Sequence, residues 1–186
     1  MWGVVGVIRV VAAALERFGH LDILANNGGR GMRIVVDINV NCPFLMARAA
    51  TPHMMRARWG RIVNTSMNRS AMRRAGFSPY GPSKAALECE TVIWAQDLQG
   101  TGVTVNALLP GGATLTGMIL SAFPESPRSR LLDPAIMVPP LLWLVSSAAD
   151  AISGCRVIGN RWDDGNPLAA TESAGWGDDA TRQRTT

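Results

Sequence analysis

The chain has 186 residues, of which 47% are hydrophobic and 17% charged, as is typical of one globular domain. Collagen, a coiled coil and wholesale disorder are excluded, because 19 glycines and 11 prolines are ordinary numbers and an apolar chain of low charge buries surface. The formal charge is +4, but the densest run of arginines, between Arg56 and Arg74, has no aromatic ladder or zinc spacing beside it. We therefore expect no nucleic-acid partner.

The cysteines and the N-terminal segment indicate the compartment. Three cysteines are too few and too scattered for a disulfide framework, and with two histidines no metal-ligand spacing is present. We expect free thiols in the cytoplasm and no metal site. The apolar start lacks a basic leader and contains Arg9, so it is typical of an amphipathic helix rather than of a secretion signal. No apolar run reaches membrane-spanning length, which predicts no membrane association.

The first half of the chain reads as a helix followed by a strand, a helix and a strand. The N-terminal helix extends to about Phe18, and Gly19 ends it. A buried strand over 21–25 runs into a turn-rich segment, and a second helix covers about 43–58 before a strand over 61–65. The inner side of the second helix is predicted to carry Phe44, Ala47, Ala50, Met54 and Met55.

The second half repeats this order. A helix over 79–98 precedes a strand over 103–109, and a helix over 134–149 precedes a strand over 155–158. Strands separated by helices of crossover length predict an α/β fold, with a parallel sheet of about four strands covered by helices on both faces. Residues 117–133 are expected to form a long loop, either a lid or a simple connector. We predict one domain over 1–162 and a loose polar tail over 163–186.

The only tyrosine and the only lysine of the chain, Tyr80 and Lys84, stand four residues apart. Four residues make about one helical turn, so both side chains lie on the same helix face. A nearby ammonium favours the phenolate, so the spacing predicts a lowered Tyr80 pKa and a side chain that donates or accepts a proton. The alternative is a buried tyrosine beside a lysine with no chemical role.

Four segments in this order, FGHLDILANNGG, RIVNTS, YGPSKAALE and VTVNALLPGG, resemble the short-chain dehydrogenase/reductase family. The resemblance covers about residues 4–162 and implies a Rossmann-like fold. It also implies a nicotinamide cofactor, NAD or NADP, and the interconversion of a small-molecule alcohol and a carbonyl. Family members often associate through the helices that correspond to 43–58 and 79–98, so a homo-oligomer is expected.

The resemblance assigns roles to individual residues. It implies that Tyr80 is the acid/base, that Lys84 lowers its pKa and holds the cofactor ribose, and that Asn39 holds a water of the proton relay. The residues implied in cofactor binding, besides Tyr80 and Lys84, are Asn26, Gly28, Pro110, Gly111 and Thr116, with Thr114 as an alternative to Thr116.

The family also uses a serine hydroxyl to hydrogen-bond the reacting oxygen. That serine stands thirteen residues before the tyrosine, where this chain has Met67. Ser66 is one residue away, and a β-bulge at the strand end can absorb a shift of one residue, so Ser66 is the first candidate and Ser70 the second. The alternative for Ser66 is a turn serine that caps the strand.

The sequence departs from the family's pattern in two further ways that affect the functional hypotheses. No segment matches the family's Gly-rich turn for the cofactor pyrophosphate, which predicts an N-terminal truncation that leaves the strand over 21–25 at a sheet edge. The span from Asn27 to Asn39 is also shorter than in the family. The sequence therefore leaves two functions open: an NAD(P)-dependent oxidoreductase, or a truncated or non-catalytic member that acts as a partner-dependent subunit.

Overall fold

A computed structural model describes residues 4–27, 35–122 and 128–175. The helices are α1 (Val4–Phe18), α2 (Cys42–Ala57), α3 (Arg69–Met72), α4 (Tyr80–Asp97), α5 (Gly117–Ala122) and α6 (Val138–Leu144). The strands are β1 (Ile23–Asn26), β2 (Gly60–Thr65), β3 (Val103–Leu109), β4 (Cys155–Ile158) and β5 (Thr171–Ser173). Single helical turns connect them: the π-helix η2 (Asp37–Asn41) and the 3-10 helices η3 (Arg128–Arg130), η4 (Pro134–Met137), η5 (Ser147–Ala149), η6 (Gly159–Arg161) and η7 (Pro167–Ala170).

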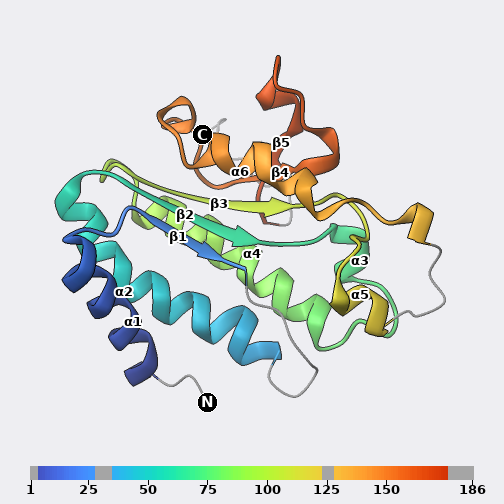
Figure 1. Ribbon diagram of the computed structural model, residues 1–186, viewed down its shortest axis with the longest axis horizontal. Coiled ribbons are helices and arrows are strands. Elements are labelled where there is room, and N and C mark those ends of the chain that lie inside the picture. Colours follow the sequence, from blue (N-terminus) through green and yellow to red (C-terminus); the bar gives the residue numbers. More distant parts are fainter. Residues whose placement is uncertain (1–3, 28–34, 123–127, 176–186) are drawn as a thin grey trace, which may run out of the picture.

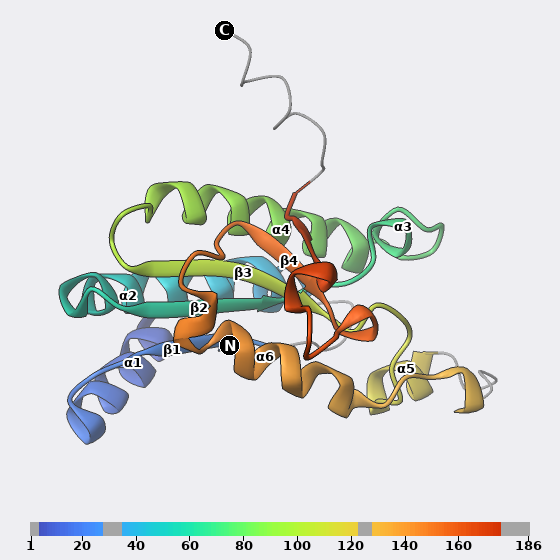
Figure 2. The same ribbon diagram turned by 90° about the horizontal axis from the view of Figure 1, so that it is seen from above.

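The strands form one sheet in the order β1-β2-β3-β4-β5, in which β1 to β4 are parallel and β5 is antiparallel to β4. Helices α1, α2 and α4 lie on one side of the sheet and α6 on the other (Figures 1 and 2). Every residue of β3 is buried, as expected for a central strand covered on both faces. The predicted α/β fold with helices on both faces is thereby confirmed.

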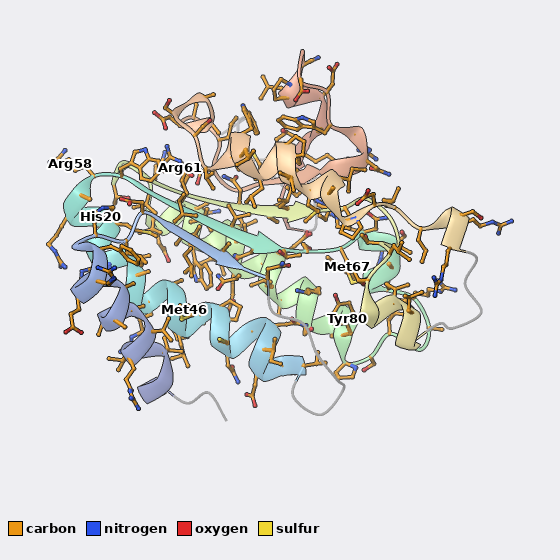
Figure 3. The ribbon with its side chains drawn as sticks, in the orientation of Figure 1. His20, Met46, Arg58, Arg61, Met67 and Tyr80 are labelled. Carbon is orange, nitrogen blue, oxygen red and sulfur yellow. The ribbon has the colours of Figure 1, made fainter. Side chains whose placement is uncertain are left out.

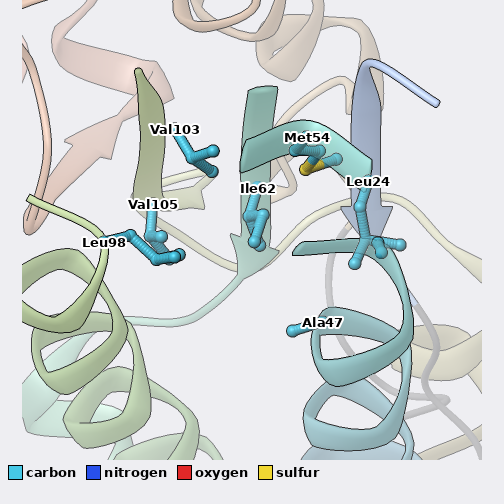
Figure 4. Packing of buried hydrophobic residues seen from close by; sticks show 8 residues of the cluster. Leu24, Ala47, Met54, Ile62, Leu98, Val103 and Val105 are labelled. Carbon is cyan, nitrogen blue, oxygen red and sulfur yellow. The ribbon is translucent and has the colours of Figure 1, made fainter. Parts of the chain in front are cut away.

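Successive residues of β2 point into two separate hydrophobic clusters, because side chains alternate along a strand. Ile62 packs with Ala47, Ala50 and Met54 of α2 (Figure 4). Val63 faces the other side of the sheet, where the cluster also contains Leu108, Leu144, Val157 and Ala170. These two clusters hold the strands in place between the helix layers.

The buried stripe of α2 is narrower than the sequence predicts. Ala47, Ala50 and Met54 are at most 4% exposed, whereas Phe44 and Met55 are each 43% exposed. Phe44 follows the buried Pro43 and Met55 follows the buried Met54, and one residue corresponds to a rotation of about 100° around the helix. Their placement on the inner side was therefore wrong.

Two segments differ from their predicted secondary structure. Residues 134–149 do not form one helix but the sequence η4, α6 and η5, with Pro139 and Pro140 in the first turn of α6, where their missing N–H groups cost nothing. Residues 117–133, expected as a loop, contain α5 and η3.

The segment from Asp163 is not a loose tail as far as the structure describes it. It forms η7 and β5, which extends the sheet beyond β4, and Ala170 is fully buried. Few apolar residues are needed here, because a small alanine fills the remaining space against the second cluster. Residues 176–186 lie outside the described part of the chain.

Candidate active site

The carboxyl ends of the parallel strands place most of the predicted site residues at one end of the molecule. Tyr80 begins α4, which follows β2 and the short helix α3. The π-helix η2 comes after β1, and Pro110 and Gly111 follow β3 directly. Figure 3 shows Tyr80 and Met67 at this end, with Arg58 and His20 at the opposite end. In open parallel sheets, ligands bind outside the carboxyl ends of the strands, so this end is the candidate active site.

Tyr80 and Lys84 share one face of α4, as the sequence predicts. The Lys84 Nζ lies 5.8 Å from the centroid of the Tyr80 ring. The lysine side chain is buried, and its ammonium donates a 2.8 Å hydrogen bond to the backbone carbonyl of Thr65 at the end of β2. The carbonyl fixes the position of the amine, while the two remaining N–H groups of Lys84 are still available as donors.

Burial shifts the pKa values of both Lys84 and Tyr80. Burial lowers the pKa of Lys84 to about 8. It raises the pKa of the Tyr80 phenol above its ordinary value, because a phenolate is poorly solvated there. The lowered Tyr80 pKa expected from the sequence is therefore wrong for this structure. At neutral pH the phenol is protonated and the lysine is charged.

Asn39 lies in the π-helix η2, and its side chain is 1% exposed. Its Nδ2 donates a 3.0 Å hydrogen bond to the Ser83 hydroxyl, which donates in turn to the backbone carbonyl of Tyr80 at 2.7 Å. The Asn39 Oδ1 is buried and has no hydrogen-bond partner within the described structure. A buried acceptor of this kind is suited to an ordered water or a ligand donor. Single π-turns inside helices are frequent at functional sites.

Tyr80 is positioned by a close approach between α3 and α4. A Cβ atom on Gly81 would lie 2.1 Å from the backbone oxygen of Met72, so only glycine fits after the tyrosine. Ser83, which links Asn39 to Tyr80, was not singled out in the sequence analysis. A small hydroxyl residue just before the lysine is the signal that could have indicated it.

Ser66 directly follows β2 and takes part in a buried network with α4 and β4. Its hydroxyl donates a 2.6 Å hydrogen bond to Glu88 Oε1, and that carboxylate lies 3.5 Å from Arg156 Nη2. All three side chains are buried. The pairing of β2 with β3 runs without an offset through Thr65, so no β-bulge shifts Ser66. The second candidate, Ser70, is exposed in α3.

The remaining predicted residues lie around the strand ends. Asn26 Nδ2 donates to Asn64 Oδ1 at 2.8 Å, which ties β1 to β2. Gly111 adopts a φ of +88°, and its carbonyl accepts hydrogen bonds from Asn68 and Asn160. Thr116 precedes α5 and Thr114 lies on the same loop. Gly28 lies outside the described residues.

Comparison with known proteins identifies the family. A profile of the family described as short chain dehydrogenase matches residues 5–126. The chain belongs to the short-chain dehydrogenase family. The predicted family of oxidoreductase enzymes is thus confirmed.

The relatives of this short-chain dehydrogenase family member are enzymes of larger size. It is 28% identical to glucose 1-dehydrogenase 2 of Bacillus subtilis (strain 168), over 82% of this chain and 67% of that protein. It is 27% identical to the 3-oxoacyl-acyl-carrier-protein reductase FabG of Thermotoga maritima, over 81% of this chain and 69% of that protein. A short chain dehydrogenase structure from Shigella flexneri 2a strain 301, complexed with NADP, superposes with a TM-score of 0.76 at 26% identity, over 85% of this chain and 71% of that one.

The structure also bears on the other compositional predictions. Among the described helices, none is long and apolar enough to cross a membrane. Cys42, Cys89 and Cys155 are free thiols. Across the described residues, the acidic, histidine and cysteine side chains do not gather into a group that could hold a metal ion.

Proposed function

We propose that the chain is an NAD(P)-dependent oxidoreductase that interconverts an alcohol and a carbonyl, with Tyr80 as the acid/base. The observation that carries this proposal is the geometry around Tyr80. A buried, charged Lys84 lies one turn along the same helix face, and Asn39 is linked to the Tyr80 backbone through Ser83. The solved relative complexed with NADP supports the choice of cofactor class.

The residues present suit the nicotinamide and ribose end of such a cofactor. Lys84 holds an ammonium with free donors beside Tyr80, and ribose hydroxyls accept such hydrogen bonds. Gly111, with its positive φ, and Thr116 follow β3 on the same end of the sheet. We assign cofactor binding to Asn26, Gly28, Tyr80, Lys84, Pro110, Gly111 and Thr116. The bound nicotinamide supplies or accepts the hydride.

The proton moves at the Tyr80 phenol. Because burial raises its pKa, the phenol is protonated at neutral pH and can donate its proton to a carbonyl oxygen as the alkoxide develops. The Lys84 charge stabilises the phenolate that remains. The unpartnered Asn39 Oδ1 can accept from a water that returns the proton to Tyr80.

A hydroxyl that holds the reacting oxygen is assigned to Ser66, with Ser70 as the alternative. Ser66 can act in this way only by turning its O–H from Glu88 toward the substrate, since it has a single proton to donate. Ser70 is exposed and needs no such exchange.

The assembly we propose is a homo-oligomer formed through α2 and α4, in a cytoplasmic setting. Phe44 and Met55 of α2 and Ile93 of α4 are each more than 40% exposed, and large apolar side chains on neighbouring helices favour association. The three free cysteines suit a reducing compartment.

A second candidate function is a non-catalytic subunit that depends on a partner. Two observations favour it: Met67 stands thirteen residues before Tyr80, and the neighbouring Ser66 hydroxyl is engaged by Glu88. Titration of the purified chain with NADH and NADPH, followed by nicotinamide fluorescence, distinguishes the two functions. Saturable binding in the micromolar range supports the oxidoreductase. A folded sample that binds neither cofactor below the millimolar range contradicts it and supports the subunit.

A further inference from the structure

A polar pocket of about 300 Å³ lies between α3, the loop after β3 and the β4–β5 pair. The residues that line it are Asn68, Arg69, Ser70, Gly111, Arg156, Ile158, Asn160, Arg161 and Glu172. Tyr80 and Lys84 are absent from this lining. A water occupies about 30 Å³ in the liquid, so the pocket has room for a small molecule with several waters.

Three arginines line this pocket, and they come from three different elements. Arg69 begins α3, Arg156 lies on β4 and Arg161 ends η6. Only one carboxylate, Glu172 of β5, is part of the lining. It forms an ion pair with Arg161 and lies 3.9 Å from Arg69 Nη1. The lining therefore carries two more positive than negative charges.

Arg156 is a charged side chain of which only 3% is exposed. Its Nη2 donates a 2.9 Å hydrogen bond to the Met67 carbonyl and lies 3.5 Å from Glu88 Oε1 behind the pocket. Its Nε has no hydrogen-bond partner within the described structure, and the same is true of the buried Arg69 Nε. A buried N–H without an acceptor is costly, so the protein's own acceptors do not saturate these two guanidinium groups.

The side-chain amides of Asn68 and Asn160 also line the pocket. Asn68 and Asn160 both direct their Nδ2 groups to the carbonyl of Gly111, at 2.9 and 3.3 Å. Gly111 has a φ of +88°, which favours glycine, and a Cβ atom there would also lie 2.0 Å from Asn160 Oδ1. The loop after β3 is thereby fixed against the pocket wall.

We propose that this pocket binds a phosphate group through Arg156, Arg69 and Arg161. A guanidinium presents a planar fork of donors that matches the oxygens of phosphate, and a lining with more arginines than carboxylates suits an anion. The phosphate belongs either to the free anion or to a larger molecule such as the cofactor. The lining shares Ser70 and Gly111 with the residues of the proposed function, but the proposal rests on the three arginines, none of which is assigned to the chemistry at Tyr80.

The test is calorimetric titration of the full chain with inorganic phosphate at constant ionic strength. We expect saturable binding that chloride does not reproduce. Arg69→Gln and Arg161→Gln should each weaken phosphate binding about tenfold or more, because each removes a charged hydrogen-bond donor. Arg9→Gln, the same change on exposed α1 at the opposite end of the molecule from α3 (Figure 1), should leave binding unchanged.

A folding control and a competition experiment complete the test. Circular dichroism confirms that each variant is folded, and because Arg69 and Arg161 are partly exposed, their replacement leaves the buried Arg156 pair intact. Competition by NADPH alone would assign the phosphate to the 2′-phosphate of the cofactor, and competition by both NADPH and NADH would assign it to the cofactor pyrophosphate. Phosphate binding unaffected by either would assign it to another source. Absence of saturable binding by folded protein, or an equal loss in Arg9→Gln, would overturn the proposal.

Discussion

The Nζ of Lys84 lies 5.8 Å from the centre of the Tyr80 ring, and its ammonium is anchored on the Thr65 carbonyl. The strand end, rather than the tyrosine, therefore fixes the position of this charge. Because the anchor belongs to the backbone, replacement of the phenol should not displace the lysine.

Tyr80→Phe is expected to reduce kcat by at least about 100-fold, because it removes the only proposed proton donor at the reacting oxygen. NADPH or NADH affinity and the thermal midpoint should change little, since the ring and the Lys84 anchor are retained. Steady-state kinetics and cofactor fluorescence separate these effects. Retention of full activity would remove Tyr80 from the mechanism.

The stability of the chain should rise with pH in a window set by Lys84. Its pKa is about 8 in the folded chain and ordinarily 10.5, so between these values the unfolded chain binds more protons than the folded one. Below pH 8, Lys84 is protonated in both the folded and the unfolded chain, so the free-energy cost of burying its charge does not change with pH. Across the window the folded state gains about 3 kcal/mol at most from this group. Urea unfolding at several pH values measures the rise, which Lys84→Met should lack.

Ser66→Ala and Ser70→Ala differ in both kcat and stability if the assignment of the hydroxyl is right. Ser66→Ala should lower kcat more strongly than Ser70→Ala. It should also cost about 1–3 kcal/mol of unfolding free energy, because Glu88 loses a buried donor. If Ser66→Ala lowers stability alone and Ser70→Ala lowers kcat, Ser70 is the hydroxyl donor.

Met67→Ser tests, by gain of function, whether catalysis requires a hydroxyl at the reacting oxygen. It places a hydroxyl thirteen residues before Tyr80, at the end of the molecule where Figure 3 shows both residues. If neither Ser66 nor Ser70 supplies the hydroxyl, we expect kcat to rise about tenfold or more, because a donor to the developing negative charge stabilises the transition state. If one of them supplies it, kcat should not rise. Met67→Leu is the matched control, and an equal rise in that variant would contradict the explanation.

The buried stripe of α2 gives a matched pair of stability predictions. Met54 is fully buried against Ile62, so Met54→Ala should cost about 2–5 kcal/mol of unfolding free energy. Met55 is 43% exposed, and Met55→Ala should cost much less in the monomer. Chemical denaturation measures both. Equal losses at dilutions where the chain is monomeric would contradict the observed orientation of α2.

Strands and helices with a continuous local pattern could be predicted from the sequence. The apolar run from Val103 to Leu109 coincides with β3, and the strand expected over 155–158 coincides with β4. Strand β5 could not be predicted, since Thr171–Ser173 is short and polar and depends on pairing with the distant β4. The π-helix was missed for a related reason, because nothing in the apolar periodicity indicates its wider turn.

The Tyr80–Lys84 pair could be predicted because four residues on one helix share a face, whatever surrounds them. The sign of the Tyr80 pKa shift could not, since it depends on burial by residues that the spacing does not include. The Glu88–Arg156 pair was missed as well. Its members belong to α4 and β4, and only the tertiary fold brings them together.

The π-turn at Asp37–Asn41 makes the site sensitive to chain length. The Cys42 N–H donates to the Asp37 carbonyl five residues back, so this turn contains one residue more than an α-helical turn. Deleting one residue here would let the α-helix run on without interruption, with everything before the deletion rotated by about 100° relative to α2. Val35, buried now, would then be carried away from its buried position, and so would Asn39 if the deletion follows it. A deletion in this turn should therefore be harmful even if it removes a residue with no role of its own.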